Sequence, residues 1–140
     1  MEKINTALAP QAVGPYSQAM ATKGYLFLSG QIGINPTSGK LEGQTVSEQA
    51  EQACKNIKTI LTAAGYGFDR VVKTTCFLTD ISAFAEFNTV YEKYFTSKPA
   101  RSCVGVAALP LGALCEIEVI VECKKRDTTT EEDETLSGLF

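Results

Sequence analysis

Residues 45–78, TVSEQAEQACKNIKTILTAAGYGFDRVVKTTCFL, combine the two patterns from which the rest of the fold can be worked out. In the first part, apolar residues recur at steps of three and four, which is the spacing of one face of a helix. Thr45 and Glu48 fit a capping box at its start, and Gly65 suits the left-handed position after a last helical turn. Residues 70–78 are rich in β-branched and aromatic side chains. The stretch therefore predicts a helix followed by a strand.

Downstream, the sequence predicts one more helix and two more strands. Apolar and aromatic residues repeat at helical spacing over residues 81–95, and Pro99 marks where that helix must have ended. Residues 102–107 and 114–123 have the composition of strands, and because a turn at 109–112 separates them, we expect a β-hairpin. Within 114–123, cysteine and aliphatic residues alternate with glutamates, which is typical of a sheet with two different faces.

Upstream, the pattern changes to short strands and turns. Residues 11–31 predict a hairpin-like entry with a strand over residues 25–29, and residues 34–43 are rich in the Gly, Pro, Asn and Ser of exposed loops. The order of elements is then β-β-α-β-α-β-β. It predicts an α+β domain with both helices on one face of a mixed sheet.

Length and composition fit a single domain. The chain has 140 residues, of which 44% are hydrophobic and 21% are charged. We expect the domain to span residues 1–125 and the acidic tail 126–140 to fray, although Leu136, Leu139 and Phe140 are apolar enough to dock. A chain this short buries only about two thirds of its unfolded surface, so we expect an enclosed ligand site to need neighbouring subunits.

The charge distribution argues against nucleic acid as a partner. The formal net charge is -3, but residues 126–140 hold five acidic residues and one basic residue, which leaves 12 bases and 11 acids elsewhere. A nearly neutral body without a basic cluster cannot neutralise several phosphates. No stretch approaches the roughly 18 apolar residues of a membrane span, and the N-terminus lacks the pattern of a signal peptide. We therefore expect a cytoplasmic protein with no membrane partner.

Cysteine and histidine usage limits the chemistry. The five cysteines are odd in number and show no CxxC spacing, so we expect reduced thiols. The chain has no histidine, which removes the commonest general base, the Ser-His and Cys-His nucleophile pairs and the commonest metal ligand. Any chemistry must rest on carboxylate, Arg, Tyr, Cys, hydroxyl or backbone groups.

Arg101 and Glu116 are the strongest candidates for a site. Arg101 is one of three arginines and opens an otherwise apolar strand, and its planar fork suits bidentate binding of a carboxylate. If the predicted hairpin pairs residues whose numbers sum to about 221, Glu116 and Glu118 share a sheet face with Arg101 and Cys103. A carboxylate beside an apolar wall has a raised pKa and can exchange protons with water. An Arg101–Glu118 ion pair and solvated glutamates would explain the same pattern without a site.

Five further residues are candidates, each with a structural alternative. Cys103 could be a nucleophile, but because no histidine exists to activate it, a pocket-lining thiol is the better interpretation. Tyr16 and Ser29 lie in segments bounded by glycine, where turn and strand residues are common. Gly30 suits a close approach of the backbone to another group. Asn88 lies among helical aromatic residues and would ordinarily be a polar residue of the helix surface.

Seven short motifs, in this order and spacing, resemble the RidA (YjgF-type) reactive-imine deaminase family. They cover most of residues 3–123, whereas the chain beyond Lys124 lies outside the family pattern. The motifs are GPYSQA (14–19), LSGQIG (28–33), TD (79–80), EFNTVYEKYF (86–95), PARSCV (99–104), LPLGA (109–113) and EIEV (116–119).

The resemblance implies a fold, an assembly and a site. The fold would be chorismate-mutase-like, and the assembly a homotrimer with three clefts between subunits. Arg101 would bind the substrate carboxylate and Glu116 would hold the water. The cleft would be lined by Tyr16, Ser29, Gly30, Asn88 and Cys103, and neither a cofactor nor a metal would be needed.

The activity implied is hydrolysis of 2-imino acids, released by pyridoxal-phosphate enzymes, to 2-oxo acids and ammonia. The alternatives are a regulatory trimer that binds 2-oxo acids without turnover, an endoribonuclease or translation inhibitor, and a chaperone-like role. The near-neutral body argues against the ribonuclease alternative.

Overall fold

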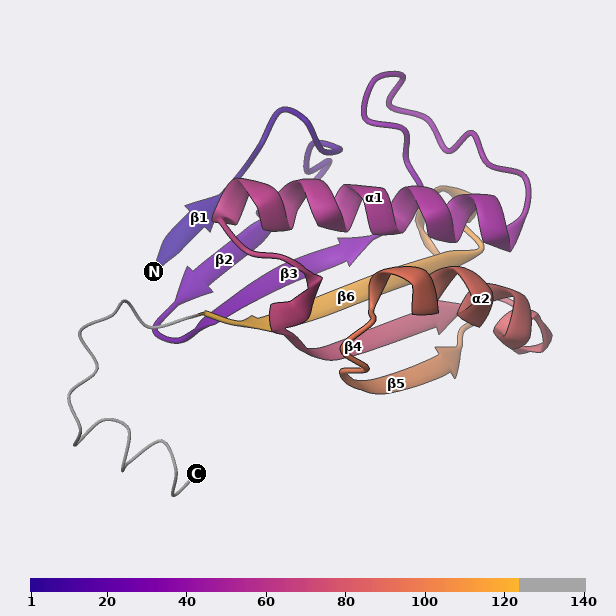
Figure 1. The fold of residues 1–140 in the computed structure, drawn as a ribbon. Helices are drawn as coiled ribbons and strands as arrows, with labels where there is room; N and C mark the ends of the chain where they lie inside the picture. Colours follow the sequence, from indigo (N-terminus) through magenta and orange to yellow (C-terminus); the bar gives the residue numbers. More distant parts are fainter. Residues whose placement is uncertain (124–140) are drawn as a thin grey trace.

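The computed structural model describes residues 1–123, which form one six-stranded sheet with two helices (Figure 1). The predicted tail at 126–140 lies outside the described residues. Neither helix of the described part is both long and apolar enough to cross a membrane. The strands and α-helices are β1 (Glu2–Ile4), β2 (Ala19–Thr22), β3 (Tyr25–Gln31), α1 (Val46–Ala64), β4 (Val71–Leu78), α2 (Phe84–Tyr94), β5 (Ala100–Gly105) and β6 (Cys115–Glu122). Three short 3-10 helices lie at Phe68–Arg70, Ile81–Ala83 and Pro110–Gly112.

The sheet is mixed, and both helices cover the same face of it (Figure 1). The strand order is β1-β2-β3-β6-β4-β5, in which β4 and β5 pair in parallel and all other neighbours pair antiparallel. The predicted α+β architecture with two helices on one face is thus confirmed. The short edge strand β1 was not predicted, because its three residues are too few and too polar to show a periodic pattern.

The predicted hairpin between the last two strands is wrong. Strand β5 pairs in parallel with β4, to which α2 connects it, and β6 lies between β3 and β4. Alternation along β6 indicates a sheet with one buried face, but it does not say which strands are its neighbours. As a result, Glu116 lies opposite Phe77 of β4, and Gly105 lies opposite Leu78.

Helix α1 begins and ends as its sequence predicts. The Thr45 hydroxyl accepts a hydrogen bond from the Glu48 backbone N–H at 3.2 Å, and Gly65 has a left-handed φ of 88°. The second half of the capping box differs, since the Glu48 carboxylate accepts from the Thr45 hydroxyl at 3.1 Å. A glycine is required at position 65 because other L-residues are strained at this φ.

The core lies between the helices and the sheet and contains three of the five thiols. Burial raises the pKa of Cys76 and Cys115 to about 12 and raises that of Cys54 as well. All five cysteines are free. The three core thiols therefore pack as small apolar side chains.

Truncation of a core side chain should destabilise the fold strongly. Ile57 of α1 is fully buried, and Ile57→Ala should lower the free energy of unfolding by about 2–5 kcal/mol, because the cavity cannot fully collapse. Urea unfolding at one protein concentration measures this, with the adjacent exposed Lys58→Ala as control. A loss under about 1 kcal/mol for Ile57→Ala would contradict this packing.

Candidate functional site

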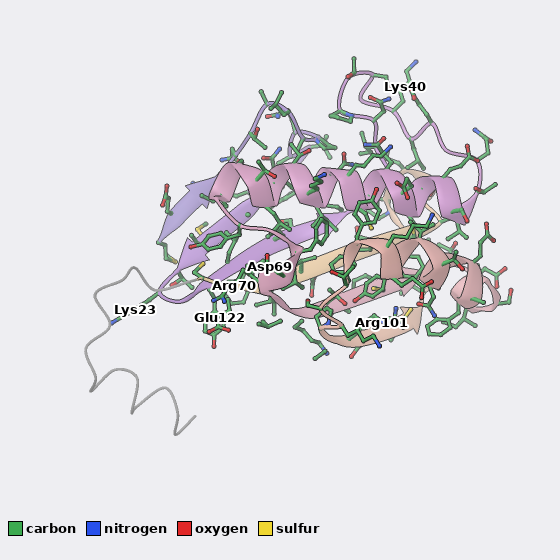
Figure 2. The ribbon with its side chains drawn as sticks, viewed as in Figure 1. Lys23, Lys40, Asp69, Arg70, Arg101 and Glu122 are labelled. Carbon is green, nitrogen blue, oxygen red and sulfur yellow. The ribbon has the colours of Figure 1, made fainter. Side chains whose placement is uncertain are left out.

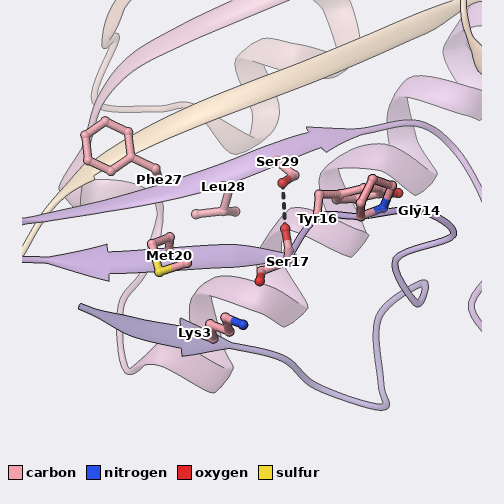
Figure 3. Close-up of a pocket in the computed structure, with 9 residues that line it drawn as sticks. Lys3, Gly14, Tyr16, Ser17, Met20, Phe27, Leu28 and Ser29 are labelled. Carbon is pink, nitrogen blue, oxygen red and sulfur yellow. Dashed lines mark hydrogen bonds between the residues drawn. The ribbon is translucent and has the colours of Figure 1, made fainter.

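A β-bulge in β3 creates the first part of the candidate site. The register between β3 and β6 shifts by one residue between Leu28 and Gln31, so that Ser29 and Gly30 occupy the irregular part of the strand. Ser29 is fixed there, because its hydroxyl donates to the Ser17 carbonyl at 2.6 Å (Figure 3) and its backbone N–H donates to Gln18 at 2.9 Å. Bulges of this kind redirect side chains and are frequent beside active sites.

The Glu116 carboxyl group packs directly on Gly30. A β-carbon at position 30 would lie 2.8 Å from the carboxyl carbon of Glu116, so this packing requires glycine. Glu116 is half-buried, and its pKa is raised, chiefly by burial and additionally by the charge of Glu118. The position thus holds a carboxyl group with an increased tendency to take up a proton.

Glu116 and Gly30 lie in a cleft of about 160 Å³ whose rim is largely apolar. The rim comes from the N-terminal loop, the loop after β3 and the turn before β6, and includes Val13, Ile34 and Leu111. Tyr16 is half exposed and lines this cleft as well as a second hollow that contains Ser29 (Figure 3). The structure therefore brings together four of the predicted residues: Tyr16, Ser29, Gly30 and Glu116.

Buried amide side chains hold the loops around this cleft. Gln18 donates to the carbonyls of Thr6 and Pro10 at 3.1 and 2.8 Å and accepts from the Thr6 N–H at 2.7 Å. Asn56 of α1 donates to the carbonyls of Ile32 and Ile34 at 3.2 and 2.8 Å. These residues were not predicted as part of the site. The sequence offered one signal for Asn56, which is a polar residue in a helix face that is otherwise apolar.

The turn before β6 is held by another buried amide, that of Gln49. Its oxygen accepts from the Leu114 N–H at 2.7 Å, and its nitrogen donates to the Gly43 carbonyl at 3.0 Å. Within this turn, Leu111 has a left-handed backbone with φ 57° and ψ 21°, followed by Gly112 with φ 70°. This conformation costs a non-glycine residue about 1–2 kcal/mol, so the surrounding structure must impose it.

Arg101 belongs to a second group of residues, at the outer edge of the sheet on β5 (Figure 2). Its Nη1 donates to Asn88 Oδ1 at 2.7 Å, and its Cζ lies 4.6 Å from the ring centroid of Tyr91 and 5.3 Å from that of Phe84. The Tyr91 and Thr74 hydroxyls share a 2.7 Å hydrogen bond. These contacts hold the guanidinium group in one orientation, and one amide oxygen cannot satisfy its five donors.

Cys103 lies on the same face of β5 as Arg101. Its pKa is raised, because burial outweighs the opposing effect of the Arg101 charge. A thiol in this state is a poor nucleophile. The geometry thus favours the interpretation of Cys103 as a residue that lines a site.

Arg101 and Glu116 lie on opposite faces of the sheet, so the prediction that they share one is wrong. Arg101 pairs with Thr74, whose buried side chain contacts α2. Glu116 pairs with Phe77, one of the residues that alternate with the buried ones. The error follows from the wrong hairpin, since β4 lies between β5 and β6. One copy of the chain therefore does not bring Arg101 and Glu116 together. A metal site is also not found, since within residues 1–123 no cluster of His, Cys, Asp or Glu could hold a metal ion.

The chain is similar to known proteins both in sequence and in structure. Residues 6–123 match the family model described as Endoribonuclease L-PSP. The 2-iminobutanoate/2-iminopropanoate deaminase of Homo sapiens is 51% identical over 118 residues, 84% of this chain and 86% of that protein. A Lactococcus lactis protein named as a regulator, AldR, is 50% identical over 125 residues, 89% of this chain and 99% of that protein. The crystal structure of E. coli TdcF with bound serine has a TM-score of 0.84 at 38% identity and covers 89% of this chain and 100% of that one.

The raised pKa of Glu116 predicts a pH-dependent gain in stability when its charge is removed. Because its folded pKa lies above the unfolded value, near 4.3, the ionised form disfavours folding at neutral pH. Below the unfolded pKa both states are protonated and the effect is absent. Glu116→Gln should therefore raise the melting temperature at pH 7 but not at about pH 3.5.

Thermal unfolding at the two pH values measures this gain, with exposed Glu122→Gln as control. Equal melting temperatures of Glu116→Gln and the native chain at pH 7 would show that burial does not disfavour the ionised form of Glu116.

Proposed function

The chain belongs to the endoribonuclease L-PSP family, which confirms the resemblance drawn from its motifs, and on this premise we propose that it hydrolyses 2-imino acids to 2-oxo acids and ammonia. The observation that carries the proposal is the half-buried Glu116 carboxyl group, held over Gly30 in a largely apolar cleft. Relatives that are named 2-iminobutanoate/2-iminopropanoate deaminase and are 51% identical to this chain support the proposal. The substrates include the small 2-imino acids of those names.

Arg101 binds the substrate carboxylate. Contacts with Asn88 and Tyr91 fix its guanidinium group, so little side-chain freedom is lost when a ligand binds. A planar fork that pairs with a planar carboxylate sets the direction of the adjacent C2 carbon. This fixed geometry supplies much of the catalysis, because water then meets a correctly oriented electrophile.

Glu116 holds the water and transfers its proton. As the water oxygen bonds to C2 of the protonated imine, the Glu116 carboxylate accepts a proton, and a tetrahedral carbinolamine forms. The protonated carboxyl then gives this proton to the amine nitrogen. As the C–N bond breaks, the Glu116 carboxylate takes up the hydroxyl proton, the C=O bond of the 2-oxo acid forms, and ammonia leaves. A raised pKa suits both steps, because the carboxyl must take up and return a proton. Ser29, Cys103 and Tyr16 line the cleft in this arrangement, and no cofactor takes part.

The complete site requires two copies of the chain, in a homotrimer with its clefts between subunits. Arg101 of one subunit faces Glu116 of the next. Two observations support this assembly: the two residues lie on opposite faces of one sheet, and the face away from the helices exposes Phe27 and Val104. Apolar residues exposed on a sheet face are typical of surfaces covered by a partner. The free thiols support a cytoplasmic location.

A regulatory trimer that binds 2-oxo acids without turnover is the second candidate. The relative named as a regulator, AldR, favours it, because the same cleft would serve both roles. The family name also suggests ribonuclease activity. A near-neutral body and a chain without histidine argue against that activity.

Loss of the arginine fork should abolish carboxylate binding. With 2-iminobutanoate generated in situ by a threonine dehydratase, the native chain should accelerate ammonia release, and Arg101→Ala should lower kcat/KM by about 100-fold or more. Arg101→Lys should be intermediate, because an ammonium group keeps the charge but loses the fork. Full activity of Arg101→Ala would exclude this role, and no acceleration by the native chain would favour the regulator.

Mixed trimers test whether the site is shared between subunits. Arg101→Ala and Glu116→Gln homotrimers should each be nearly inactive. Co-expression in equal amounts should restore activity at about a quarter of the sites, where an intact Arg101 meets an intact Glu116 from the neighbouring subunit. Two different affinity tags would verify that the trimers are mixed. Verified mixed trimers without activity would exclude a shared site.

A further inference from the structure

Leu111 occupies an unusual position at the rim of the Glu116 cleft. Its backbone is left-handed, and its side chain remains 66% exposed. A leucine gains no local interaction from this conformation, because its β-carbon crowds the following carbonyl. Residues held in such conformations cluster at ligand sites.

The end of the turn that leads into β6 is fixed, while its tip is exposed. After the tip, the Ala113 N–H donates to the Pro110 carbonyl at 3.1 Å, and Ala113 is buried. The Leu114 N–H then donates to Gln49 of α1 at 2.7 Å, and the Leu114 carbonyl accepts from the Thr79 N–H at 3.2 Å. The leucine side chain is therefore held at a defined place on the rim.

The chemistry of the cleft favours one class of ligand side chain. Leu111, Val13, Ile34 and Pro110 form an apolar rim, and Glu116 is the one charged residue that lines this cleft in the described part of the chain. An acidic side chain would approach Glu116 without a compensating cation. An apolar side chain would instead lose water against the rim, which favours binding by about fourfold for each buried methylene, or ~0.8 kcal/mol.

We infer that Leu111 selects ligands by their side chain, favouring 2-imino acids, and the matching 2-oxo acids, with extended apolar side chains over those with acidic ones. The inference rests on the proposed function, because it takes the ligand carboxylate to lie at Arg101 and C2 at Glu116. With C2 at Glu116, a ligand side chain that stays within the cleft meets the apolar rim to which Leu111 belongs.

Binding of stable 2-oxo acids to the full chain, measured by calorimetry, tests the inference without turnover. The native chain should bind 4-methyl-2-oxopentanoate about 15-fold more tightly than 2-oxobutanoate, because two more carbons contact the rim at about fourfold each. It should bind 2-oxoglutarate more weakly than either. In Leu111→Gly and Leu111→Asn, both compatible with a left-handed backbone, this preference should fall to about twofold or less.

Leu8→Ala is the matched control, since Leu8 is a second exposed leucine, lies near the N-terminus and does not line the cleft. It should keep the preference of the native chain. An unchanged preference in both Leu111 variants would overturn the inference, as would equally tight binding of 2-oxoglutarate by the native chain.

Parallel kcat/KM values for the corresponding imines, generated by an amino acid oxidase, separate this inference from the proposed function. A Leu111-dependent preference in binding, without deamination of any imine, would support the inference and overturn the enzyme. Deamination with the same side-chain preference in the native chain and the Leu111 variants would support the enzyme and overturn the inference. If the native chain neither bound any of the 2-oxo acids nor deaminated any imine, both would be overturned.

Discussion

The position of β6 between β3 and β4 is the constraint on which the rest of the structure depends. Its cysteine and aliphatic side chains alternate into the core beneath the helices, which leaves Glu116 and Glu118 on the other face. Pairing with β3 brings Glu116 beside the bulge, where Gly30 leaves room for its carboxyl group. The stability of the core and the chemistry of the cleft are thus determined by the same strand.

Buried amides connect this rigid sheet to the loops that form the cleft. Gln18 binds backbone groups of the N-terminal loop, and Gln49 and Asn56 of α1 bind those of segments far from them in sequence. Within residues 1–123, every buried side-chain polar atom has a hydrogen-bond partner. Because an unpaired buried amide would cost about 1–3 kcal/mol, these contacts restrict the loops to one arrangement. Irregular segments can therefore hold Tyr16 and Leu111 in defined positions.

The sequence predicted local structure well and strand pairing poorly. Helix α1 could be predicted because its apolar period, its Thr45 cap and Gly65 are local features. The partner of β6 could not, since alternation is compatible with any neighbour, and the assumed hairpin placed Arg101 and Glu116 on one face. The contact between Gly30 and Glu116 and the left-handed Leu111 were beyond prediction for the same reason, because both depend on pairing and on loop anchors distant in sequence.

The separation of Arg101 from Glu116 within one chain has a chemical advantage for the proposed site. If both groups lay in contact on one sheet face, they would form an ion pair, and the guanidinium charge would lower the pKa of the carboxyl. The arginine would then be occupied before a substrate carboxylate arrived, and the carboxylate would be a weaker proton acceptor. Strand β4 keeps them apart, so that burial can raise the pKa of Glu116 while Asn88 and the aromatic rings orient Arg101. In the proposed trimer the substrate joins the two groups, because its negative carboxylate lies beside the arginine and its electrophilic carbon lies beside the glutamate.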